Sequence, residues 1–186
     1  MDFHELGSKI IEEYKDVFSR IDDRMIDAFI HEITTHERLF FIGVGREGMM
    51  TRAFAMRMTH MGKEVHWIWD DTTPGIGEGD LLVATIGSGE IGHIRYVCER
   101  AKEHGARIVI ITGSPSGNAV KLADFVLFIP GQVYGGTDDV APSVQPMGNL
   151  FEQSLLIVLD MICIKMVDEN PDITYEKMEK RHRNVE

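Results

Sequence analysis

The sequence predicts a doubly wound α/β fold, in which a five-stranded parallel sheet carries helices on both faces. Short runs rich in β-branched and aromatic residues alternate with helical stretches, and glycine-rich turns follow the first and third of these runs. Because right-handed crossovers join parallel strands, few other arrangements fit this alternation. The chain has 186 residues, the length of one domain with a sizeable core. We therefore expect a single domain of three layers.

Two leading helices are expected before the sheet. Apolar residues recur in residues 3–36 at the three- and four-residue spacing that lines one face of a helix. We therefore divide the domain into leading helices (1–36), an α/β core (37–168) and a C-terminal helix and tail (169–186).

Five strands and the helices between them follow from local composition. The strands are expected at residues 38–42, 65–69, 80–86, 107–112 and 125–129. The intervening helices are expected at 47–61, 91–104 and, shorter, 118–122. The methionines around the 47–61 helix are explained mostly by core packing, and contact with another subunit is the alternative for one of its faces.

The segment after the last strand is a long loop followed by a long helix. Residues 130–146 are rich in Gly, Asp and Pro, and their length is typical of a lid or binding segment. A plain solvated connector is the alternative. Residues 147–166 then keep apolar side chains at helical spacing around a wide arc, which predicts a helix buried on more than one side.

Composition and charge exclude several classes of partner. A net charge of -11 repels nucleic acid and anionic membranes. No apolar run approaches the roughly 20 residues that span a bilayer, and the acidic start does not have the pattern of a signal peptide, so we expect a cytoplasmic protein. Cys98 and Cys163 fall in helical patterns without the spacing of a metal or redox motif. We expect two buried free thiols and no disulfide.

The two glycine-rich turns carry the candidate binding residues. Residues 43–48 follow the first strand and open a helix, which fits a dinucleotide-binding turn, and Asp70 and Asp71 stand where a ribose-binding acid would be. A nicotinamide or flavin site is therefore a rival interpretation. Residues 87–90 form a second such turn, so the two would line one crevice at the carboxyl ends of the strands. Tight strand-to-helix connections alone are the alternative reason for these glycines.

Several stretches taken together resemble the SIS (sugar isomerase) domain family, and in particular its 6-phospho-3-hexuloisomerase branch. They are GVGREGMMTRAFAMRMTHMGKEV, TTPGIGEGDLLVATIGSGE, KLADFVLFIPG, QPMGNLFEQSLLIVLD and RHRNVE. They follow the family's order from about residue 40 onward, and their combination is more specific than any single motif. The resemblance implies a flavodoxin-like SIS fold and a phosphosugar isomerase that interconverts 3-keto and 2-keto hexose 6-phosphates. It also implies a dimer or tetramer with sites near subunit interfaces, and no metal or nucleotide cofactor.

The resemblance implies a catalytic role for Glu152. This residue, in LFEQ, matches the family's carboxylate and is the candidate base that moves a proton between adjacent carbons through an enediolate. An acid placed favourably in the first turn of a helix is the alternative.

Further roles are implied for a histidine and for the turn residues. His182, in RHRNVE, matches the family's closing histidine and is a candidate for ring opening or proton transfer at a neighbouring subunit's site, the alternative being a histidine in a frayed tail. Arg46 matches the arginine after the first glycine pair, and would pair with a sugar oxygen or the enediolate, or only with a carboxylate. The candidate substrate-binding residues are Gly45, Arg46, Glu47, Gly87, Ser88, Gly89 and Glu90.

The chain departs from the family's pattern where phosphate is expected to bind. Glu47 replaces a serine, and Ile86 and Ile91 replace the outer hydroxyl residues of the second turn, which leaves Ser88. Each lost charge-assisted hydrogen bond to phosphate costs about 1.5 to 3 kcal/mol, so we expect weak phosphate binding unless other donors substitute. Candidates for that substitution are Thr85, Ser114 and residues of the 130–146 loop.

Three hypotheses follow. The first is an active ketose-phosphate isomerase that gives fructose 6-phosphate in a rearranged pocket. The second is an isomerase or binding protein for a sugar derivative without that phosphate, whose hydroxyl or amino group Glu47 receives. The third is a non-catalytic SIS module that senses a sugar or supports assembly.

Overall fold

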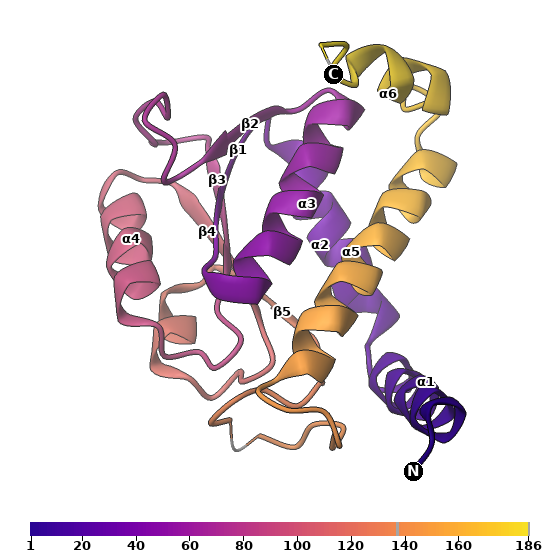
Figure 1. Cartoon of the computed structure of the whole chain (residues 1–186). Helices are drawn as coiled ribbons and strands as arrows, with labels where there is room; N and C mark the ends of the chain where they lie inside the picture. The colour runs from indigo at the N-terminus through magenta and orange to yellow at the C-terminus, as the bar shows by residue number, and fades with distance from the viewer. Residues whose placement is uncertain (137, 186) are drawn as a thin grey trace.

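The structure, a computed structural model that describes residues 1–136 and 138–185, has the three-layer α/β architecture that the sequence predicts (Figure 1). The helices are α1 (Phe3–Ser19), α2 (Asp23–Thr35), α3 (Gly45–Met61), α4 (Gly92–Glu103), the 3-10 helix η1 (Asn118–Leu122), α5 (Asn149–Glu169) and α6 (Tyr175–Arg181). The strands are β1 (Arg38–Ile42), β2 (Glu64–Trp67), β3 (Leu81–Thr85), β4 (Arg107–Thr112) and β5 (Phe125–Phe128). All neighbouring strands are parallel, in the order β2-β1-β3-β4-β5.

Alternating side chains along the strands build two cores, one on each face of the sheet. In β1, Leu39 and Phe41 face the core shared with α2, α3 and α5, whereas Phe40 and Ile42 face the core under α4 and η1. Successive side chains of a strand point to opposite faces, so a strand buried on both sides reads as one continuous apolar run. This is why the strands could be recognised from composition.

The second strand is shorter than the sequence predicts. It ends at Trp67, because the Trp67 carbonyl oxygen accepts hydrogen bonds from the amide of Asp70 at 2.9 Å and the hydroxyl of Thr73 at 2.5 Å, which turn the chain. The expected continuation to residue 69 is therefore wrong, and the Trp69 side chain is exposed.

The long helix α5 packs against α3 on one face of the sheet, and its N-terminus lies beside the N-terminus of α3 (Figure 1). Cys163 in α5 and Cys98 in α4 are buried free thiols, as expected. In the described part of the chain, no helix combines the length and apolar character needed to cross a bilayer.

Helix α1 supports the loop that precedes α5. The buried carboxylate of Glu13 accepts hydrogen bonds from the hydroxyl of Ser143 (2.7 Å), the amide of Val144 (2.7 Å) and the side chain of Gln145 (3.0 Å). Burial alone would raise the pKa of Glu13, but these hydrogen bonds lower it below its ordinary value. The leading helices thus hold one end of the loop whose other residues reach the candidate site.

Candidate functional site

A cavity lies at the carboxyl ends of β1 and β3, where the sheet changes winding direction. The helix after β1, α3, covers one face, whereas the helix after β3, α4, covers the other, so the two strand-to-helix turns diverge and leave a crevice between them. The cavity measures about 280 Å³. Its lining residues are Val44, Gly45, Arg46, Glu47, Gly87, Ser88, Ile91, Val133, Tyr134, Met147, Gly148, Phe151 and Glu152.

The first turn presents two charged side chains to this cavity. Gly45 has φ +57°, a left-handed conformation that glycine adopts without a Cβ penalty, and the chain enters α3 there. Arg46 and Glu47 therefore occupy the first turn of α3. The helix begins at Gly45, two residues before the start that the sequence predicts.

Glu47 closes one side of the cavity against the second turn. Its Oε2 accepts a hydrogen bond of 2.8 Å from the Gly87 amide. A Cβ on Gly87 would lie 2.6 Å from that oxygen and 2.9 Å from the Phe151 ring, so only glycine permits this approach. An amide that could otherwise face a bound anion is thus occupied by the protein's own carboxyl group.

The carboxyl group of Glu47 is poorly compensated. Its Oε1 is buried and has no hydrogen-bond partner among the described residues. Burial raises the pKa of Glu47 to about 7; the Gly87 amide opposes this shift, and the charge of Glu152 adds to it. Glu47 therefore carries a proton through part of the physiological pH range.

Glu152 lies in the first turn of α5 and reaches into the same cavity. Arg46 Nε lies 2.8 Å from Glu152 Oε2. The two side chains form an ion pair, but this Oε2 accepts no hydrogen bond among the described residues. Burial raises the pKa of Glu152, and the Arg46 charge pulls it back down. A carboxylate base beside a guanidinium is thus brought to the cavity by two helices far apart in sequence.

The second turn contributes fewer side chains to the cavity than the sequence predicts. Gly87 and Ser88 line it. Gly89 instead lies against Gly117, and the Glu90 carboxylate accepts hydrogen bonds from the Asn118 amide (2.8 Å) and side chain (3.0 Å). Gly89 and Glu90 therefore fasten this turn to the start of η1, and neither lines the cavity.

The two isoleucines that replace the family's hydroxyl residues lie in different surroundings. Ile91 lines the cavity, but Ile86 is fully buried in the core under α4. The candidate substitutes are already engaged: Thr85 accepts a 2.7 Å hydrogen bond from Thr51. The Ser114 hydroxyl donates to Asp138 of the loop before α5. Neither Thr85 nor Ser114 lines the cavity.

Sequence reasoning missed the part of the wall that the loop and the start of α5 contribute. Val133, Tyr134, Met147 and Gly148 line the cavity beside the buried ring of Phe151. Met147 has φ +59°, an uncommon backbone conformation for a residue with a Cβ, and it lies at the cavity rim. The length and composition of 130–146 were the available signal; they suggested a binding segment, left a plain connector open, and did not identify the lining residues.

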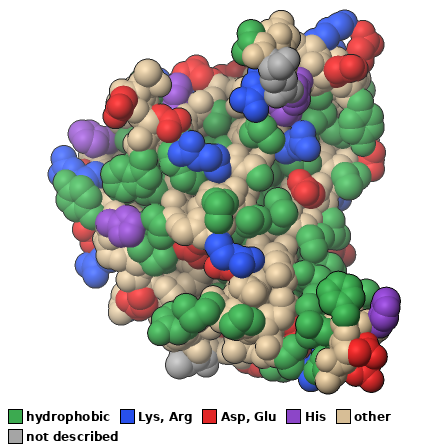
Figure 2. Space-filling model, in the orientation of Figure 1, with side chains coloured by type: hydrophobic (Ala, Val, Ile, Leu, Met, Phe, Trp, Pro, Cys, Tyr) green, Lys and Arg blue, Asp and Glu red, His purple; other side chains and the backbone are tan. Residues whose placement is uncertain are grey.

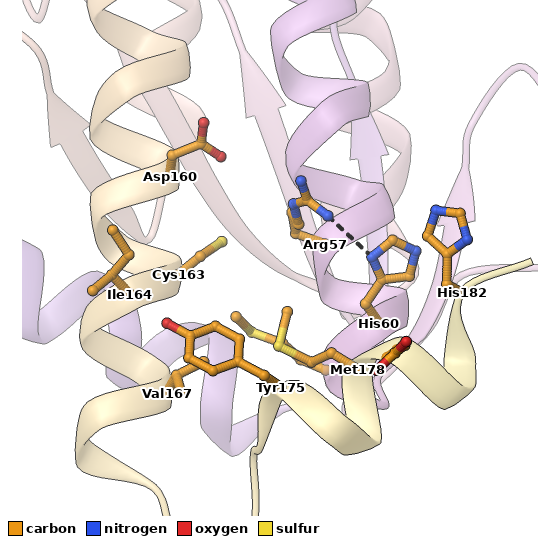
Figure 3. Close-up of a pocket in the computed structure, with 11 residues that line it drawn as sticks. Arg57, His60, Asp160, Cys163, Ile164, Val167, Tyr175, Met178 and His182 are labelled. Carbon is orange, nitrogen blue, oxygen red and sulfur yellow. Dashed lines mark hydrogen bonds between the residues drawn. The ribbon is translucent and has the colours of Figure 1, made fainter.

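His182 lies far from this cavity within one chain. Its ring centroid is 5.2 Å from that of His60 at the C-terminal end of α3, where Arg57 also approaches His60 (Figure 3). Arg46 and His60 are roughly 20 Å apart along α3, at about 1.5 Å per residue. Figure 1 shows the C-terminal residues at the opposite end of the molecule from the start of α3. Glu152 and His182 therefore do not meet within a single chain.

The outer face of α3 and α5 carries exposed apolar side chains. Met49, Met56, Met161 and Ile164 are each about half exposed. Figure 2 shows hydrophobic side chains spread over this face with charged groups between them. At the end of this face next to α6, a second cavity of about 470 Å³ lies between α3, α5 and α6 and includes His182 (Figure 3).

Comparison with known proteins places this fold and its turns in one family. The model of the SIS domain matches residues 32–133, more than half of the chain. The chain belongs to the SIS domain family. Two relatives of this SIS-domain protein are named 3-hexulose-6-phosphate isomerase. The Bacillus subtilis (strain 168) protein is 31% identical over 98% of this chain and 98% of its own length, and the Mycobacterium gastri protein is 35% identical over 96% and 89%.

A solved structure extends the likeness of this SIS-domain protein to three dimensions. The crystal structure of a hypothetical protein from Methanococcus jannaschii, for which a 3-hexulose-6-phosphate isomerase function was inferred, has a TM-score of 0.82 and 28% identity over the whole of both chains. The agreement covers the leading helices and the C-terminal helix as well as the matched domain.

Proposed function

We propose that this SIS-domain protein is a phosphosugar isomerase of the 6-phospho-3-hexuloisomerase type, which forms fructose 6-phosphate in the cytoplasm without a metal or nucleotide cofactor. The coarser assignment, a sugar-phosphate isomerase, is supported by several relatives that are named 3-hexulose-6-phosphate isomerase and match nearly the full chain. The observation that carries the proposal is the Arg46–Glu152 ion pair at the rim of the cavity between the two turns.

The proposed chemistry is a proton transfer between adjacent carbons. Glu152 acts as the base that takes a proton from the carbon beside the carbonyl, and the same group returns it to the neighbouring carbon. The enediolate formed between these steps is negatively charged. Arg46 lies beside the base, so its positive charge can stabilise the enediolate. Partial burial favours such a base, because it raises the pKa of Glu152 toward working pH.

We further propose that the active form is a homo-oligomer in which His182 acts at a neighbouring subunit's cavity. Within one chain His182 lies at the wrong end of α3 to reach Glu152. The apolar face of α3 and α5, with Met49, Met56 and Met161, offers a surface for that association.

A second candidate function is favoured by Glu47. Its carboxyl group occupies the Gly87 amide inside the cavity, and Ile91 adds an apolar side chain where a hydroxyl was expected. Both features suit a sugar derivative with a hydroxyl or amino group at that position better than a doubly charged phosphate. A sugar-binding SIS protein of altered specificity is therefore the alternative.

The deciding experiment is an isomerase assay with a 3-keto hexose 6-phosphate, followed by enzymatic detection of fructose 6-phosphate. Thermal-shift titrations with fructose 6-phosphate, glucosamine 6-phosphate, inorganic phosphate and unphosphorylated sugars run in parallel, because ligands of the native state raise the melting temperature. Turnover with shifts confined to phosphorylated sugars supports the isomerase. Absence of turnover, with shifts only for unphosphorylated sugars, would reject it in favour of the alternative.

A further inference from the structure

We propose that Glu47 is a second catalytic residue of this protein, a general acid that exchanges a proton with the substrate's oxygens while Glu152 exchanges one with its carbons. This inference rests on the proposed isomerase function and adds a group to it. It starts from the position of Glu47, which lines the same cavity as Glu152 but comes from a different helix.

The geometry gives the two carboxyl oxygens of Glu47 different tasks. Oε2 is held as an acceptor by the Gly87 amide at 2.8 Å, so it is not the oxygen that carries a proton. Oε1 is buried and has no partner among the described residues, which leaves it to hold the proton and donate it. A buried polar atom without a partner is costly, and a substrate carbonyl oxygen would satisfy it.

The charges around the cavity separate the two glutamates into a base and an acid. Among the described lining residues, the ionisable ones are Arg46, Glu47, Tyr134 and Glu152, and Arg46 supplies the one permanent positive charge. Arg46 pairs with Glu152 and favours its ionised form. No cation pairs with Glu47 among the described residues, and its burial, together with the charge of Glu152, favours its protonated form. Two carboxyl groups whose surroundings push their ionisation apart are suited to opposite roles.

The proton balance closes within the cavity. Glu152 takes the proton from C2, the electrons of that bond form the C2–C3 double bond, and the C3 carbonyl oxygen takes the proton of Glu47. This transfer from Glu47 converts the enediolate of the proposed mechanism into a neutral enediol, so its negative charge does not persist. Glu47 then removes the proton from the C2 hydroxyl, a carbonyl forms at C2, and Glu152 returns its proton to C3. Both glutamates regain their starting states, and no oxidant or reductant is needed.

The same assignment removes the conflict between Glu47 and a phosphorylated substrate. A protonated Glu47 is neutral, so it does not repel an anionic ligand inside a small cavity, whereas an ionised Glu47 does. Raising the pH through about 7 should therefore remove the acid and introduce a repulsive charge at once.

The test compares the pH dependence of kcat/KM in the wild type with Glu47→Gln, between pH 5.5 and 9. Glu99→Gln is the matched control, because Glu99 is a partly exposed residue of α4 that pairs with Arg95 and does not line the cavity, and it should behave as the wild type. We expect wild-type kcat/KM to fall above about pH 7. Glu47→Gln should lose about 100-fold or more at pH 6 and should no longer show this fall, because an amide donates a hydrogen bond but no proton.

A second variant distinguishes an acid from a purely structural residue. Glu47→Asp keeps a carboxyl group and should recover part of the activity together with a fall at high pH. An active wild type with unchanged kcat/KM and pH profile in Glu47→Gln would overturn this inference alone. An inactive wild type would overturn the proposed isomerase function as well.

Discussion

Arg46 of α3 and Glu152 of α5 are joined by an ion pair of 2.8 Å between Nε and Oε2, at the rim of the cavity between the two glycine-rich turns. The Glu152 side chain is 17% exposed and the Arg46 side chain 49%. The base candidate is therefore the more enclosed partner, and its charge is controlled by a residue of a different helix.

Replacing Glu152 by Gln should abolish turnover while the fold and ligand binding persist. The amide has the same shape but cannot take a proton, and loss of a general base costs about 100- to 10,000-fold. The measurement is kcat at saturating 3-keto hexose 6-phosphate, with thermal melting as a test of folding. Glu169→Gln, at the other end of α5, is the control. Undiminished activity would remove Glu152 from the mechanism.

Replacing Arg46 by Gln should move the acidic limb of the pH profile. Arg46 lowers the pKa of Glu152, so without it the base stays protonated up to a higher pH. We expect the rise of kcat/KM with pH to shift upward, while Arg95→Gln on α4 leaves it in place. A lower kcat/KM with an unmoved limb would mean that Arg46 contacts only the substrate.

Glu47 should make the folded protein less stable as pH rises. Its pKa is near 7 in the folded state and near 4.5 when unfolded, so between these values the folded state binds more protons. The free energy of unfolding should fall by at most about 1.4 kcal/mol per pH unit across this window. Urea unfolding at pH 5.5 and pH 8 measures it. Glu47→Gln should lose this contribution, and an equal pH dependence in both proteins would contradict the assigned pKa.

His182 and Glu152 should complement each other between subunits. We expect His182→Ala and Glu152→Gln homo-oligomers each to be poorly active, because each lacks one group of every composite site. Subunit exchange between them would create some sites with both groups, so mixing should restore a fraction of wild-type kcat. Co-purification of differently tagged subunits verifies the exchange. Verified mixed oligomers without recovered activity would contradict a role for His182 in the neighbouring site.

The location of the cavity could be inferred from sequence, because it depends on turns that are formed by residues close together in the chain. Glycines after the first and third apolar runs predict tight turns, and neighbouring parallel strands place such turns at one edge of the sheet. Gly45, Arg46, Gly87 and Ser88 do line the cavity. Gly89 and Glu90 do not line it, because they contact Gly117 and Asn118 at the start of η1. A turn motif does not reveal those contacts, so the sequence could not exclude these two residues.

What the sequence determined by itself is the order of elements, since the spacing of apolar side chains reports which face each helix or strand buries. What only the tertiary structure decided is the surroundings of the charged groups. Glu47 meets the amide of Gly87, 40 positions away, and Arg46 meets Glu152 from another helix. His182 lies beside His60 instead of Glu152. Desolvation and ion pairing depend on which distant segments pack together. The protonation states of ionisable side chains in a site are therefore set by the tertiary structure.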